Sequence, residues 1–100
     1  MEHESVDILK SEIARIAGKH LDTGKYRVFF FGSRVRGNST PRSDIDIGIE
    51  GREELPLRVK GEIEEEIEAL PVLYEMDVVD FTAASEKFRN FARRWTEPII

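Results

Sequence analysis

The chain has no cysteine and only four prolines, two methionines and one tryptophan among its 100 residues. The lack of cysteine excludes disulfides and thiolate metal sites. Basic residues are also scarce relative to acidic ones, 15 Lys and Arg against 20 Asp and Glu. The resulting net charge of −5 argues against broad, nonspecific affinity for nucleic acid, although it does not exclude a local basic patch.

Long apolar stretches are missing as well. No apolar run approaches the length needed to cross a membrane. The N-terminal residues do not combine a basic segment with an apolar one, so they do not predict a signal peptide. We therefore expect a cytoplasmic protein without a membrane association. Since no repeat, low-complexity tract or linker interrupts the sequence, we expect residues 1–100 to form a single domain.

Apolar periodicity and turn residues predict an alternation of helices and strands. The predicted helices lie at about residues 5–21, 33–37, 56–70 and 82–97, and the predicted strands at 26–31, 44–49 and 74–81. Ser5 and Thr82 are the expected N-caps of the first and last helices, and Pro98 ends the last one. The order α-β-α-β-α-β-α predicts an α/β arrangement in which helices pack on a small three-stranded sheet.

The turn after the first predicted strand begins with Gly32-Ser33. A strand that runs through glycine into a helical turn leaves backbone N–H groups open to a phosphate, and glycine permits a close approach. Ser33 adds a hydroxyl donor, and Arg34 and Arg36 are placed to neutralise phosphate charge. Taken alone, the same residues also fit an ordinary turn with surface arginines.

Two aspartates open the second predicted strand, Asp44 and Asp46, with one residue between them. Side chains alternate along a strand, so both carboxylates are expected on one face. Carboxylate oxygens suit Mg²⁺, and two such ions can hold the attacking and leaving oxygens of a displacement. The alternative is an edge strand with polar residues that face water, or a loop-end cap at Asp44.

A third carboxylate normally completes such a site, and the third predicted strand offers Asp77 and Asp80. We expect Asp77, because an unpaired charge in mid-strand is costly, whereas Asp80 near the strand end is placed to cap the last helix. Other phosphate and metal motifs fail. The spacing from Gly32 to Gly37 resembles a P-loop, but Asn38 stands where the lysine is required.

The combination Gly32-Ser33-x10-Asp44-x-Asp46 resembles the signature of the DNA polymerase β-like nucleotidyltransferases. The string from Phe31 to Gly37 and the segment from Met76 to Phe81 are similar to the minimal nucleotidyltransferases in particular. The resemblance implies a small mixed sheet flanked by helices. It also implies an enzyme that uses Mg²⁺ and a nucleoside triphosphate to transfer a nucleoside monophosphate to a hydroxyl, with release of pyrophosphate.

Carried over by position, the resemblance makes Asp44 and Asp46 metal ligands and gives Asp77 the task of assisting the attacking hydroxyl. Gly32, Ser33 and Arg36 would hold the triphosphate of ATP. Stand-alone minimal members are commonly paired with a HEPN-domain RNase toxin, which they neutralise, in some systems by transferring AMP to a toxin tyrosine. The expected partner is therefore a HEPN protein, and a homo-oligomer stays an open alternative.

Two other functions stay open at this point. One is a catalytically dormant binding module that silences its partner by contact, for which the apolar stripe of Phe88, Phe91 and Trp95 is suited. The other is a transferase for a small molecule or an RNA end, although such enzymes usually carry further domains that bind the acceptor.

Overall fold

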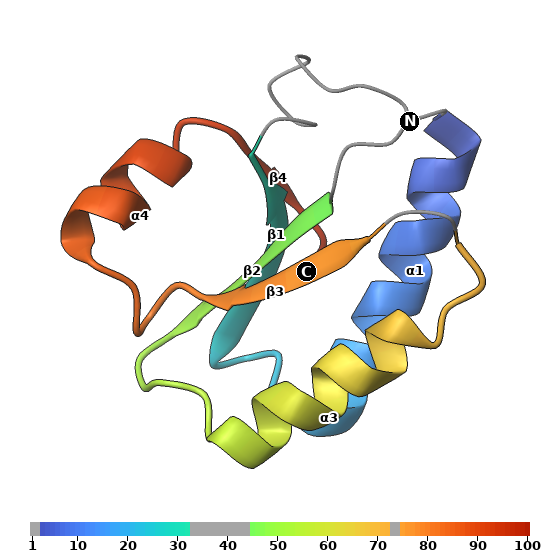
Figure 1. The fold of residues 1–100 in the computed structure, drawn as a ribbon, viewed down its shortest axis with the longest axis horizontal. Coiled ribbons are helices and arrows are strands. Elements are labelled where there is room, and N and C mark those ends of the chain that lie inside the picture. Colours follow the sequence, from blue (N-terminus) through green and yellow to red (C-terminus); the bar gives the residue numbers. More distant parts are fainter. Residues whose placement is uncertain (1–2, 33–44, 73–74) are drawn as a thin grey trace.

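The computed structural model describes residues 3–32, 45–72 and 75–100 (Figure 1). Within these residues, three helices accompany a four-stranded mixed sheet. The elements are α1 (His3–His20), β1 (Tyr26–Phe31), β2 (Ile45–Gly51), α3 (Leu57–Glu68), β3 (Met76–Asp80), α4 (Glu86–Ala92) and β4 (Thr96–Pro98). The mixed α and β class is confirmed. The expected short helix at 33–37 lies outside the described residues.

The sheet has the strand order β3-β2-β1-β4, with β1 antiparallel to β2 and β4, and β2 parallel to β3. The three expected strands are therefore present, but the prediction of a three-stranded sheet was wrong. The residues assigned to the end of the last helix, Thr96–Pro98, instead pair with Phe29–Phe31 at the edge of the sheet. Pro98 is tolerated there because an edge strand does not require every backbone donor.

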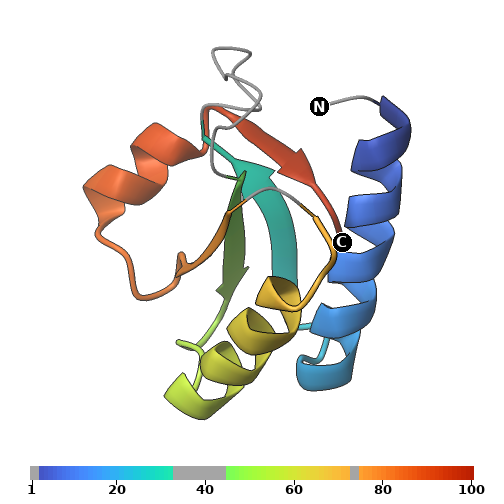
Figure 2. The same cartoon turned by 45° about the vertical axis from the view of Figure 1, so that its right-hand side comes forward.

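Helices cover both faces of the sheet (Figures 1 and 2). One face packs on α1 and α3 through a core that includes Ile13, Ile63, Phe30 and Ile47, each at most 2% exposed. The other face carries a smaller cluster in which Phe29 and Phe31 meet Phe81 and Ala92 of the α4 region. The alternating side chains of β1 thus serve two different cores, which accounts for its nearly continuous apolar sequence, whereas β2 alternates Ile with Asp46, Gly48 and Glu50.

The last helix begins later than its sequence suggests. Ser85, and not Thr82, is the N-cap, and its hydroxyl accepts a hydrogen bond from the Phe88 N–H at 3.2 Å. Thr82 instead bonds the backbone of Gly51, with its hydroxyl 2.9 Å from the Gly51 nitrogen. In the part of the chain that the structure describes, no helix is both long enough and apolar enough to cross a membrane.

Candidate functional site

Asp46 and Asp77 lie next to each other on adjacent parallel strands. They are register partners in the β2–β3 pairing, so their backbones are separated by one strand spacing, about 4.8 Å. Both residues are on the face that α4 covers, since Gly48 and Val79, two positions further along each strand, pack with the Phe81 cluster. Two carboxylates held this close repel each other, and a divalent cation between them would relieve the repulsion.

Gly32 packs directly against the Asp46 carboxylate at the end of β1. Its φ is +91°, in the region that favours glycine, and a Cβ at this position would stand 2.5 Å from Asp46 Oδ2. The Gly32 N–H donates to the carbonyl oxygen of Trp95 at 3.2 Å. The glycine that the sequence assigned to a phosphate turn is therefore also the residue that makes room for the carboxylate of Asp46.

An aromatic cluster supports this end of the sheet. Phe31 is the register partner of Asp46 across β1 and β2. Its ring meets the rings of Phe81 and Phe88 edge-on, at centroid distances of 4.8 and 6.1 Å. Phe31 and Phe81 are buried, so Asp46 lies beside packed aromatic rings.

The choice between Asp77 and Asp80 rested on a burial argument that the structure corrects. β3 is an edge strand of the described sheet and Asp77 is exposed, so no burial penalty acts on its charge. Asp80 is committed elsewhere. Its carboxylate accepts hydrogen bonds from the N–H groups of Leu55 at 2.9 Å and Thr82 at 3.0 Å. It therefore organises the loops that flank β2 and β3, and only Asp77 lies beside Asp46.

Ser33, Arg36 and Asp44 lie outside the described residues, so the structure does not test their expected positions. Of the candidate site residues, it brings together Gly32, Asp46 and Asp77. Within residues 3–32, 45–72 and 75–100, no group of three or more His, Cys, Asp or Glu side chains is arranged to hold a metal ion. The described part of the site thus contributes two carboxylates, and a third would have to come from Asp44.

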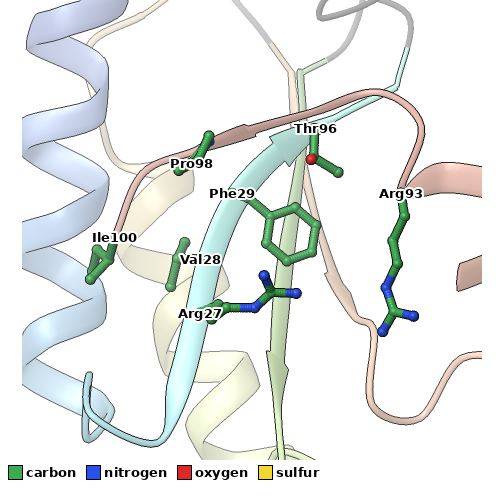
Figure 3. A pocket seen from close by; sticks show the side chains of 7 residues that line it. All are labelled: Arg27, Val28, Phe29, Arg93, Thr96, Pro98 and Ile100. Atoms are coloured by element: carbon green, nitrogen blue, oxygen red, sulfur yellow. The ribbon is translucent and has the colours of Figure 1, made fainter.

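Sequence reasoning missed a hollow of about 240 Å³ on the α4 side of β1, lined by Arg27, Phe29, Arg93 and Thr96 among others (Figure 3). Both arginines bond the carboxylate of Glu50, Arg27 at 2.8 Å. Burial by itself would raise the pKa of the Glu50 carboxyl, but the hydrogen bonds from Arg27 and Arg93 outweigh it and the pKa is lowered. These residues are far apart in the sequence and come together only because β1, β2 and α4 are neighbours in the fold. No local sequence motif therefore predicts the hollow.

Comparison with known proteins identifies the family. The model of the polymerase beta nucleotidyltransferase family matches residues 11–99. The chain belongs to this family. The resemblance seen in the Gly32-Ser33 and Asp44-x-Asp46 motif is therefore confirmed over nearly the whole sequence.

The chain is also similar to individual proteins. It is 32% identical over 69 residues to a probable protein adenylyltransferase, MntA, of Haemophilus influenzae, covering 69% of this chain and 60% of that protein. A toxin–antitoxin crystal structure with AMP-PNP has a TM-score of 0.74 at 19% identity, covering 91% of this chain and 72% of that one.

A second solved structure contains a tri-AMPylated HEPN toxin of Shewanella oneidensis in complex with an MNT antitoxin. Its TM-score is 0.71 at 16% identity, and the match covers 94% of this chain and 71% of that one. At these identities the two solved structures establish the fold alone. The chain spans 60% of the length of its curated relative, so activity, substrate and partner do not follow from the match by themselves.

Proposed function

We propose that this nucleotidyltransferase domain transfers AMP from ATP to a hydroxyl group of a partner protein, in a reaction that depends on Mg²⁺. The observation that carries the proposal is the side-by-side placement of Asp46 and Asp77 on one face of the sheet, with Gly32 packed against the Asp46 carboxylate. This arrangement joins a carboxylate pair to a glycine turn, as a metal-bound nucleotide requires.

Each residue has a distinct part in the proposal. Asp46 and Asp77, together with Asp44, would hold the metal, for which their hard oxygen ligands are suited. Bound Mg²⁺, as two ions, would neutralise charge on the phosphates. Gly32 would let the triphosphate approach the backbone closely, Ser33 would bring its backbone N–H and its hydroxyl to it, and Arg36 would be a further cationic contact.

The reaction is an in-line displacement at the α-phosphorus of ATP. The acceptor oxygen forms a new P–O bond, while the bond from that phosphorus to the oxygen bridging the β-phosphate breaks and pyrophosphate leaves. The acceptor proton has to be taken up, and Asp77 is the proposed recipient because its carboxylate is exposed on the edge strand beside Asp46. The expected catalytic residues are therefore Asp44, Asp46 and Asp77.

The relatives support a protein as the acceptor and a HEPN toxin as its identity. The curated relative is described as a probable protein adenylyltransferase, and one structure with a similar fold holds a tri-AMPylated HEPN toxin with its MNT antitoxin. By analogy, the chain would act as an antitoxin in the cytoplasm and neutralise its toxin by AMPylation. The bound AMP-PNP in the other complex favours ATP as the nucleotide.

The test incubates the chain with α-labelled ATP, Mg²⁺ and the product of the adjacent gene, and follows label on the acceptor. We expect Asp46→Asn and Asp77→Asn each to reduce transfer by at least about 100-fold, since each removes a charged ligand. The matched control is Asp22→Asn, the same chemical change at the opposite end of β1, where Asp22 Oδ1 accepts from the Gly24 N–H at 2.9 Å. Equal transfer by all three variants would refute the metal role.

A second function, silencing of the partner by contact alone, is favoured by one observation. Phe91 is 59% exposed and Phe88 and Trp95 are each 38% exposed, which suits a binding surface. The two functions differ in one measurement. If the Asp46→Asn variant neutralises the partner as fully as the unaltered chain, with no modified partner in the mass spectrum, contact suffices.

A further inference from the structure

Aromatic and basic side chains gather on α4 and on the segment that follows it. We call this the α4 surface and define it by the exposed residues Phe88, Phe91, Trp95, Lys87 and Arg94. Soluble domains seldom leave several large aromatic side chains exposed together unless they contact a partner. Aromatic residues and arginine are also the types that interfaces enrich.

Charge sets this surface apart from the rest of the molecule. Residues 86–95 contain four of the 15 basic residues and one of the 20 acidic residues of a chain whose net charge is −5. The helix on the opposite face of the sheet, α3, carries five glutamates. Lys87 and Arg94 form no ion pair with the described residues, so their charges are available to a partner. The complement of this surface is therefore acidic.

The hollow of Figure 3 is also positively charged. Arg93 and Thr96, which flank Arg94 and Trp95 in the sequence, line it together with Arg27. Its two guanidinium groups share one carboxylate, that of Glu50, so one positive charge is left over. The side chains of Arg27 and Arg93 are 69% and 48% exposed, whereas that of Glu50 is 14% exposed. A carboxylate of a binding partner could therefore contact the guanidinium groups of Arg27 and Arg93.

The α4 surface adjoins the candidate site through two contacts. The carbonyl oxygen of Trp95 accepts the Gly32 N–H at 3.2 Å. The ring of Phe88 lies 6.1 Å from that of Phe31, the register partner of Asp46. The chain from α4 to β4 accordingly passes the end of β1 (Figure 1). A segment bound on the α4 surface would lie beside the carboxylate pair.

We propose that the α4 surface and the neighbouring arginine-lined hollow dock an acidic segment of the acceptor protein that also carries apolar side chains, and that this docking holds the acceptor hydroxyl near Asp46 and Asp77. The inference rests on the proposed function for the identity of the occupant. A protein is favoured over RNA because the net charge of −5 opposes a long polyanion, whereas a short acidic segment meets only the local positive charge.

The test reverses the charges of the two basic residues of the α4 surface with the double variant Lys87→Glu/Arg94→Glu. Its matched control is Arg58→Glu on α3, an 82% exposed arginine on the other side of the sheet. Binding to the product of the adjacent gene is measured by calorimetry at low and high salt, and binding of Mg²⁺ and ATP without a partner is measured by thermal shift. We expect the double variant to bind the partner about tenfold or more weakly, mainly at low salt, with an unchanged thermal shift.

Steady-state transfer gives a second readout. In the double variant the KM for the acceptor should rise while the KM for ATP stays constant, a split that general misfolding does not produce. Phe91→Ser tests the aromatic part and should weaken partner binding in the same way. The proposal is overturned if both variants bind the partner with unchanged affinity. It is also overturned if the double variant binds the partner normally but loses affinity for a labelled single-stranded RNA oligonucleotide.

Failure of docking and failure of the proposed function are distinguishable. If the unaltered chain binds the partner through this surface but transfers no label to it, docking stands and AMP transfer is refuted. If transfer occurs and the double variant performs it with an unchanged acceptor KM, AMP transfer stands and the docking surface is refuted.

Discussion

Replacement of Gly32 by alanine tests the geometry on which the site depends. The backbone at Gly32 has a φ of +91°, which costs a residue with a Cβ about 1–2 kcal/mol. The added Cβ would also stand 2.5 Å from Asp46 Oδ2, far inside van der Waals contact, so the carboxylate has to move by about 1 Å. We expect the free energy of unfolding to fall by about 1–3 kcal/mol.

The displacement of Asp46 has a functional consequence that is separate from stability. A shift of about 1 Å in a positioning group typically costs about 100-fold in rate. We therefore expect Gly32→Ala to lose about that factor in AMP transfer and to weaken the thermal shift produced by Mg²⁺ and ATP. If the loss acts through Asp46, adding Gly32→Ala to Asp46→Asn should cost little more activity, since the two changes share one cause.

Gly61 supplies the control. It lies within α3, and nothing stands within 4 Å of the Cβ that a substitution would add. Gly61→Ala should therefore raise the free energy of unfolding by about 0.5–1 kcal/mol in urea titrations and leave transfer unchanged. The reasoning is refuted if Gly32→Ala unfolds like the unaltered chain and transfers AMP at its rate.

Three further predictions concern stability in urea titrations. Glu50→Gln should lower the free energy of unfolding by about 1–2 kcal/mol at neutral pH and make stability less dependent on pH in acid. The pKa of Glu50 is lowered in the folded protein, so its stabilising contribution is complete above the ordinary value of 4.5 and is lost as pH falls through the lower, folded value. Ser85→Ala should cost about 1 kcal/mol by removing a helix cap, and an unchanged free energy of unfolding would contradict the cap. Gly48→Ala should cost about 1–3 kcal/mol because its Cβ would stand 2.4 Å from the Phe29 ring, and an unaltered midpoint would contradict that packing.

Local patterns predicted the parts of the fold whose signals are contained in one segment. The apolar run at Tyr26–Phe31 is a strand with the expected bounds, and the stripe of Ile63 and Ile67 faces the core from α3 as its spacing indicated. β4 escaped prediction because three residues that include a proline carry no periodic signal of their own. Only the open edge of β1 makes Thr96–Pro98 a strand.

The site shows the same division. The sequence predicted Asp44 and Asp46 as a carboxylate pair with Asp77 as the third carboxylate, and the register of β2 with β3 places Asp46 and Asp77 side by side. The physical reason offered for Asp77 was wrong, because a sequence does not say that β3 lies at the sheet edge and leaves this side chain exposed. Asp80 could be set aside only when its hydrogen bonds to Leu55 and Thr82 were seen.

The two faces of the sheet differ in their packing and in the charged residues that they carry. On the face of α1 and α3 the buried core is aliphatic apart from Phe30, and it is the larger of the two clusters. On the face of α4 the packing is aromatic and thinner, with Phe88 and Phe91 left exposed, and Asp46, Asp77 and Glu50 all lie on this side. Because Gly32 is hydrogen-bonded to Trp95 and packed against Asp46, an acceptor bound on the α4 surface would contact a segment that is joined to Asp46 through one residue. Recognition of an acceptor and alignment of the reacting groups would then depend on the same short stretch of backbone.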